Sequence, residues 1–186
     1  MKIKACTLTV AVLVAWALKR HYAGARADDL WWILAPTAEL VGIITRVPFT
    51  WQPGEGYFSR EQLFLIEKSC AGINFMIAAF AMLVFTVFHR VSGGLMAVHV
   101  LGVSVLASYT AAVSANAVRI AFAMWLTPRF VALTAVSPAD IHRIEGIAVY
   151  FGGLMLLYDV AQRLDHHASI VGSSVGADGR HAEVAS

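Results

Sequence analysis

The sequence predicts an all-α protein: a polytopic bundle of transmembrane helices that also contains one short re-entrant or surface helix. Only 14% of the 186 residues are charged, whereas soluble domains average about 25%. Hydrophobic residues make up 59% of the chain. They gather in blocks, several of which approach the roughly 20 residues that cross a bilayer. Basic residues lie at the edges of these blocks, a placement that anchors helices at the membrane surface.

The net charge of +2 is small. Because no basic run is interleaved with aromatic residues, we expect no nucleic-acid partner, and the expected surroundings are a lipid bilayer. The two cysteines, Cys6 and Cys70, belong to no Cys-x-x-Cys pair and no His/Cys cluster, so we expect no metal site and no cofactor. Cys6 lies inside an apolar block, where free thiols are common, and we interpret both thiols as unpaired.

Two apolar blocks precede the first long polar stretch. The block from Ala5 to Leu18 resembles a signal peptide. We favour a retained first helix, because Lys19-Arg20 directly after a cleavage site would be unusual. The block from Leu30 to Val47 contains Pro36 and either spans with a kink or enters the membrane and returns. The orientation of the N-terminus stays open on these observations.

A polar stretch then separates these blocks from a pair of uncharged ones. Residues 48–69 contain Gln52-Pro53-Gly54-Glu55-Gly56, and this turn chemistry predicts a loop. The uncharged block from Gly72 to Phe88 is followed, after Ser92-Gly93-Gly94, by a second block that stays uncharged to Val118. Their short connection predicts a helical hairpin within the membrane.

The last third of the chain is less regular. Residues 119–137 are apolar but interrupted by Pro128-Arg129, which predicts a short helix, a turn and a second short piece that together stay at one membrane face. A final block runs from about Asp140 to Tyr158. The sequence therefore predicts a transmembrane domain over residues 1–161. The polar tail over residues 162–186 is rich in glycine and serine, and we expect it to be disordered.

Basic residues suggest how these helices are oriented. Arg90 closes one block and Arg163 follows another, and both are expected on the cytoplasmic side. Cys70, Arg119 and His142 then all lie at the opposite face, where residues far apart in sequence can meet. We therefore expect a multi-pass protein of the cell membrane whose functional site faces the extracytoplasmic side.

Four residues at that face have suitable chemistry. Cys70 precedes an uncharged helix, whose positive end stabilises the thiolate form. Asn116 and Arg119 are three residues apart and share one helix face, and we interpret them as donors to a substrate oxygen. His142 has a side chain that titrates near working pH and is suited to act as a base and an acid.

Each of these residues also has a simpler interpretation. Cys70 can be a small buried apolar residue, and Arg119 can extend its side chain to the membrane surface. His142 can be a helix-start histidine at the water boundary. Their convergence, rather than any one of them, indicates a catalytic site.

The ordered strings Cys70-Ala71-Gly72 and Ala115-Asn116-Ala117-Val118-Arg119, followed by His142, resemble the exosortase/archaeosortase family, and most of all exosortase K. The similarity spans roughly residues 30–157. It implies a multi-spanning membrane protein in which Cys70 is the nucleophile, Arg119 the essential cation and His142 the base. Ala71 stands where the common family form has a serine.

The resemblance further implies a membrane cysteine protease or transpeptidase. Its substrate would be an exported protein with a C-terminal sorting signal made of a short motif, a transmembrane helix and a basic cluster. Cleavage would pass through a thioester on Cys70 and end in transfer to an acceptor. The alternative is a non-enzymatic membrane assembly factor or a small transporter subunit, in which Arg119 and acidic residues pair helices. Serine, aspartate and metal types of intramembrane protease lack their motifs in this chain.

Overall fold

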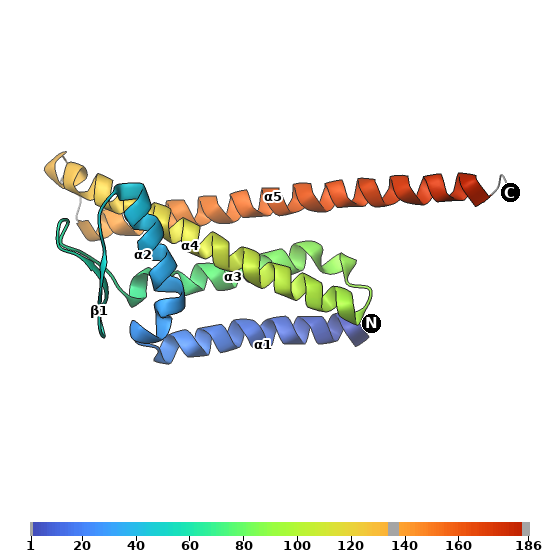
Figure 1. Ribbon diagram of the computed structural model, residues 1–186, viewed down its shortest axis with the longest axis horizontal. Coiled ribbons are helices and arrows are strands. Elements are labelled where there is room, and N and C mark those ends of the chain that lie inside the picture. The colour runs from blue at the N-terminus through green and yellow to red at the C-terminus, as the bar shows by residue number, and fades with distance from the viewer. Residues whose placement is uncertain (1, 134–137, 184–186) are drawn as a thin grey trace.

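The computed structural model describes the backbone of residues 2–133 and 138–183, and the side chains of residues 2–125 and 143–167. The described chain is predominantly helical, as the sequence predicts. Figure 1 shows α1, α3, α4 and α5 running along the length of the molecule, with α2 and a small sheet at one end. The helices are α1 (Lys2–Gly24), α2 (Trp31–Thr45), α3 (Ile73–Val87), α4 (Gly94–Leu133) and α5 (Pro138–Glu183), joined in part by the short 3-10 helices η1 (Asp28–Leu30), η2 (Lys68–Ala71) and η3 (Phe88–Arg90).

Three helical segments within the described residues are long and apolar enough to cross a membrane. They are Lys68–Arg90, Gly94–Trp125 and Arg143–His167, and they correspond to α3, most of α4 and the described middle of α5. α1 is not among these three, although it is a continuous helix packed along α3. The helical fold class is therefore confirmed, and length and composition are compatible with several membrane crossings.

α2 lies across the end of the bundle instead of running along it (Figure 1). Its 15 residues span about 22 Å, which is less than the roughly 30 Å of a bilayer core. The sequence left open whether residues 30–47 cross, and this placement favours a segment that does not. One face of α2 packs on α4. Its fully or nearly buried residues recur at helical spacing: Ile33, Leu34, Thr37, Ala38 and Val41.

Residues 48–69 form more than the predicted loop. They fold into a three-stranded antiparallel sheet in the order β1-β2-β3. The strands are β1 (Thr50–Gln52), β2 (Gly56–Ser59) and β3 (Phe64–Ile66), with Trp51 opposite Tyr57 and Tyr57 opposite Ile66. The predicted turn residues connect β1 to β2, where Gly54 has a φ of 82°. The predicted loop at Gln52–Gly56 is therefore confirmed as the β1–β2 turn, and the strands that flank it were not predicted.

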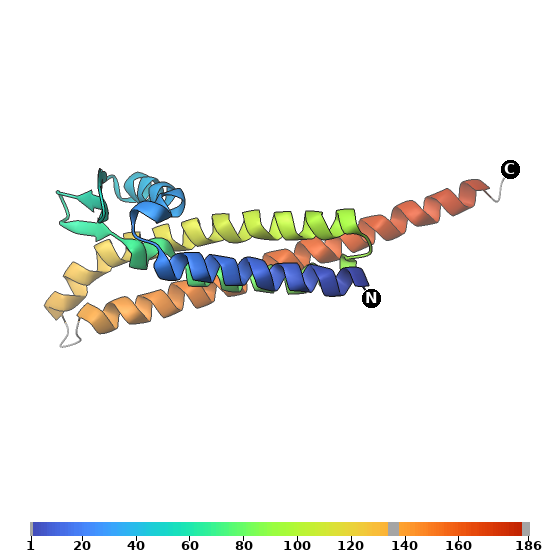
Figure 2. The same cartoon turned by 90° about the horizontal axis from the view of Figure 1, so that it is seen from below.

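α4 does not break at Pro128-Arg129. Its helix continues from Gly94 to Leu133, so the predicted break at Pro128-Arg129 is wrong; residues 134–137 of that segment lie outside the described residues. A proline removes one backbone hydrogen bond and bends a helix, and a long helix can continue beyond it. Figure 2 shows this end of α4 bending away from the rest of the helix. The chain reverses after Leu133, and α5 starts at Pro138, a favoured residue for a first helical turn.

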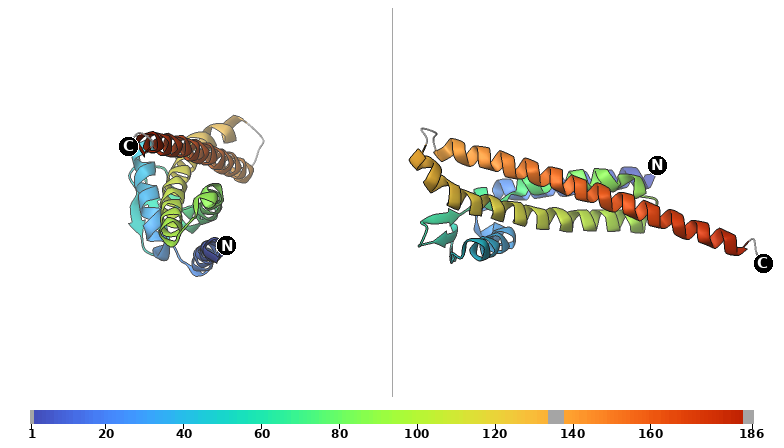
Figure 3. Two further views of the ribbon diagram at one scale, coloured as in Figure 1. Left: turned by 90° about the vertical axis from the view of Figure 1, so that its right-hand side faces the viewer. Right: turned by 90° about the horizontal axis from the view of Figure 1, so that it is seen from above.

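The predicted disorder of residues 162–186 also differs from the structure, because α5 continues as helix to Glu183. Figure 3 shows α5 passing at an angle over the other helices and extending beyond them. Arg163 donates to Asp159 one turn earlier at 2.8 Å, a pairing that supports helix. The Arg90 side chain also bonds Asp165, so the described part of this segment is tied to the end of α3.

The core lies mainly at the end of the bundle that holds α2 and the sheet. There η2, β3 and α2 pack against α3 and α4. Fully or almost fully buried apolar side chains from all five elements form this cluster, among them Ile33, Ile66, Ala71, Ile73 and Ile120. A second, smaller cluster of Ala11, Phe80 and Val84 joins α1 to the middle of α3. The larger core thus fixes the end of the bundle at which the polar residues described next are buried.

Candidate functional site

Cys70 lies in η2, the short turn between β3 and α3. Its backbone N–H donates to the Glu67 carbonyl at 2.9 Å, and its side chain is 5% exposed. Gly72 follows with a φ of 64° and redirects the chain into α3. The thiol therefore sits just before α3, as predicted, but it is buried within the turn.

The turn is held from outside by Lys68. Its Nζ donates to the Ala25 carbonyl at 2.8 Å and lies 5.0 Å from the centre of the Tyr22 ring. These contacts tie η2 to the end of α1 and the segment after it. The position of Cys70 is thereby fixed by the surrounding chain, which a nucleophile requires.

α4 directs Asn116 and Arg119 toward the interior of the bundle. Asn116 is fully buried and Arg119 is 6% exposed, and their three-residue spacing places them on one helix face, as predicted. Asn116 meets the turn that holds Cys70: a Cβ added at Gly72 would lie 2.0 Å from Asn116 Nδ2. The structure therefore brings Asn116 next to the Cys70–Gly72 turn, with Arg119 one helical turn further along α4.

α5 adds Tyr150, which sequence analysis missed. The Tyr150 hydroxyl donates to Asn116 Oδ1 at 2.5 Å, and the Arg119 guanidinium carbon lies 5.5 Å from the centre of the ring. The same ring stacks on Phe75 of α3, with centroids 5.2 Å apart. Tyr150 is thus a side chain at which α3, α4 and α5 meet.

Glu145 of α5 places a carboxyl group beside Arg119. It is 5% exposed and interacts electrostatically with the guanidinium. The helices approach closely here, because a Cβ added at Gly146 would lie 3.9 Å from Arg119 Cδ.

His142 has a backbone position near the start of α5, three residues before Glu145. Its side chain lies outside the part of the structure that is described. The prediction that its imidazole joins Cys70 and Arg119 therefore remains a prediction. The fold meets one requirement for it, because the early turns of α5 pack at the level of Arg119.

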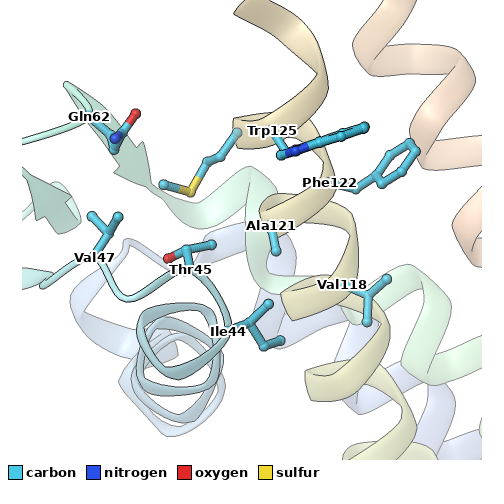
Figure 4. Close-up of a pocket in the computed structure, with 9 residues that line it drawn as sticks. Ile44, Thr45, Val47, Gln62, Val118, Ala121, Phe122 and Trp125 are labelled. Atoms are coloured by element: carbon cyan, nitrogen blue, oxygen red, sulfur yellow. The ribbon is translucent and has the colours of Figure 1, made fainter.

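A groove of about 860 Å³ opens on a different side of α4, between this helix and the end of α2 with the loop residues Val47 and Gln62. Figure 4 shows Val118, Phe122 and Trp125 on one side and Ile44 on the other. These side chains are between 45% and 55% exposed. α4 therefore presents Asn116 and Arg119 inward and an apolar surface outward, so this groove is separate from the buried polar cluster.

Comparison with known proteins identifies no relative. No family model matches the chain, and no curated protein and no solved structure matches it. The function is therefore inferred from the residues and their geometry.

Proposed function

We propose that this protein is a polytopic membrane enzyme, a cysteine protease or transpeptidase that uses Cys70 as its nucleophile. The observation that supports this most is the buried polar cluster at one end of three apolar helices. In that cluster Asn116 packs against Gly72, and Tyr150 donates a hydrogen bond to Asn116 and faces Arg119. Burying so many polar groups in an apolar bundle is costly and marks a functional site.

The proposed reaction begins with a proton transfer from the Cys70 thiol to His142. The thiolate attacks the carbonyl carbon of the scissile peptide bond, and the carbonyl oxygen becomes an oxyanion. Arg119 and Asn116 donate hydrogen bonds to that oxygen. The C–N bond then breaks, the amine takes the proton from His142, and the acyl group remains as a thioester on Cys70. Water or an amine acceptor attacks the thioester and restores the thiol.

The proposed setting is the cell membrane, with the cluster at the extracytoplasmic side. Lys4 and Arg90 lie together at the other end of the bundle, where Lys4 Nζ is 3.5 Å from the His89 carbonyl and Arg90 bonds Asp165. We assign that end to the cytoplasm. α2 would then lie along the outer surface, because it does not run with the spanning helices, and the N-terminus would be cytoplasmic.

The proposed substrate is an exported protein whose C-terminal sorting signal consists of a motif, a transmembrane helix and a basic cluster. A substrate tethered by its own helix is confined to the bilayer plane near the enzyme. This confinement raises its effective concentration without requiring tight binding to the motif. Such confinement would matter for this protein, because it has little surface outside its helices with which to bind a substrate.

The test is to compare the C-termini of exported proteins in native cells that carry either Cys70→Ala or Cys6→Ala. Cys6 is the matched control, because it is the chain's other thiol and is exposed on α1. We expect Cys70→Ala to leave sorting signals uncleaved at unchanged protein levels, and Cys6→Ala to process them normally. Normal processing by Cys70→Ala would remove the proposal.

The second candidate is a non-enzymatic membrane assembly factor. The buried Arg119–Glu145 interaction between α4 and α5 favours it, because such a pair can also serve to join helices. Arg119→Lys separates the two, since lysine keeps the charge but loses the planar array of donors. Loss of processing with normal assembly would support a catalytic role for the Arg119 guanidinium. Normal processing would mean that Arg119 serves only as a charge that pairs α4 with α5.

A further inference from the structure

We propose that Tyr150 is a positioning residue that fixes the carboxamide of Asn116, so that its NH2 group faces the Cys70–Gly72 turn. This inference rests on the proposed function, in which Asn116 donates to the substrate oxygen. It adds a residue from α5 to the proposed nucleophile and oxygen donors, which come from η2 and α4.

The hydrogen bonds of Asn116 define the orientation of its amide. The Tyr150 hydroxyl donates to Oδ1 at 2.5 Å, which leaves the NH2 group on the other side of the amide. Asn116 is fully buried, and within the described part of the chain its Nδ2 atom has no hydrogen-bond partner. A buried donor without an acceptor costs free energy. An acceptor that arrives with the substrate would offset that cost.

The free side of the amide lies at the nucleophile's turn. A Cβ at Gly72 would come within 2.0 Å of Nδ2 and 2.8 Å of Cγ, so the amide packs directly on the Gly72 backbone. Gly72 is two residues from Cys70. A carbonyl carbon attacked by the Cys70 thiolate would thus develop its oxyanion in the neighbourhood of this unpaired donor, which is the arrangement that oxyanion stabilisation needs.

Tyr150 is itself well held. Its ring stacks on Phe75, and Phe75 in turn lies 3.4 Å from a Cβ added at Gly153 of α5. The ring therefore stays in place when only its hydroxyl is removed. Tyr150→Phe should keep the packing of α3 against α5 and delete only the bond to Asn116. Because the oxygen and nitrogen of an amide are similar in size, the freed amide can then turn its oxygen toward the site and repel an oxyanion.

The experiment measures kcat and KM for cleavage of a membrane-reconstituted reporter that ends in motif, transmembrane helix and basic cluster. The variants are Tyr150→Phe, Asn116→Ala and the double variant, with Cys70→Ala as the inactive reference. Tyr158→Phe is the matched control: Tyr158 lies on the same helix, and its hydroxyl accepts a bond from Gln162, away from the cluster. A structural role alone would lower thermal stability without separating kcat from KM.

We expect Tyr150→Phe to lower kcat by about 10- to 100-fold, the scale of a misplaced catalytic group, with KM and melting temperature close to those of Tyr158→Phe. The double variant should be no slower than Asn116→Ala, because the hydroxyl acts only through the amide. If Tyr150→Phe equals Tyr158→Phe, or its loss adds fully to that of Asn116→Ala, the positioning role is overturned while the proposed function stands. Cleavage by Cys70→Ala would overturn both.

Discussion

Gly72 joins the turn that holds Cys70 to the first residue of α3, and its geometry admits no side chain. Its φ is 64°, a left-handed conformation that costs other residues roughly 1–2 kcal/mol. In addition, a Cβ would overlap the Asn116 amide at 2.0 Å. Gly54 has a φ of 82° but nothing within 4 Å of its added Cβ. Comparing the same substitution at the two glycines therefore distinguishes the cost of backbone strain from the cost of steric overlap.

We expect Gly72→Ala to destabilise the protein by about 1–3 kcal/mol more than Gly54→Ala does, because only the first variant also overpacks the core. Unfolding in detergent, followed by circular dichroism, measures the difference. Gly72→Ala should also change the rate at which Cys70 is alkylated, because the turn that holds the thiol must shift. Gly54→Ala should leave that rate unchanged. Equal stability of the two variants would mean that Asn116 does not pack on Gly72.

The residues of the candidate site were predictable from sequence where a polar or charged side chain is costly to bury in an apolar segment. Arg119 and Asn116 interrupt an apolar run, and polar groups there usually have a function. Tyr150 gives no such signal, because a tyrosine in an apolar block is compatible with packing or interfacial anchoring. Its role depends on a hydrogen bond to a residue 34 positions earlier, which local spacing cannot predict.

At the level of elements, the long helices were predictable and their interruptions were not. Uninterrupted apolar blocks predicted α3 and the first part of α4. The strands β1, β2 and β3 have only three or four residues each, too few for a period-two pattern to be recognised. Pro128 was read as a break, whereas the structure continues α4 beyond it. For the strands, pairing with the neighbouring strand supplies what the local pattern leaves ambiguous.

The contact between α3 and α5 can be tested with two neighbouring glycines. A Cβ at Gly153 would lie 3.4 Å from the Phe75 ring, whereas one at Gly152 would meet nothing within 4 Å. We expect Gly153→Leu to destabilise the protein by roughly 1–3 kcal/mol through overpacking and Gly152→Leu to have little effect. Thermal unfolding in detergent measures this, and equal midpoints would contradict the described packing of α5.

At the scale of the whole molecule, the two ends of the bundle differ in composition and structure. One end holds α2, the sheet and the buried polar cluster, and the other holds the η3 turn with its contacts to Lys4 and Asp165. The proposed function requires the first end to face outward. Basic residues such as Lys19 and Lys68 lie at that end too, so labelling is a more direct test of the orientation than a count of charges.

We expect an impermeant maleimide to label Glu55→Cys, but not Ser92→Cys, in intact cells, using a Cys6→Ala background. Both positions are exposed, Glu55 in the β1–β2 turn and Ser92 between η3 and α4, and these two connections lie at opposite ends of the bundle (Figure 1). Native Cys70 is buried and should contribute little. Disruption of the cells should make Ser92→Cys reactive as well. The opposite labelling pattern would place the polar cluster in the cytoplasm and contradict the proposed orientation.

The covalent intermediate is the central claim, and mass spectrometry of the protein after acid quenching during turnover tests it most directly. We predict an acyl adduct on the peptide that contains Cys70, removed by hydroxylamine as a thioester should be, and none on the peptide that contains Cys6. Turnover of the reporter with Cys70 unmodified at every time point, or with an adduct that hydroxylamine leaves in place, would contradict the account.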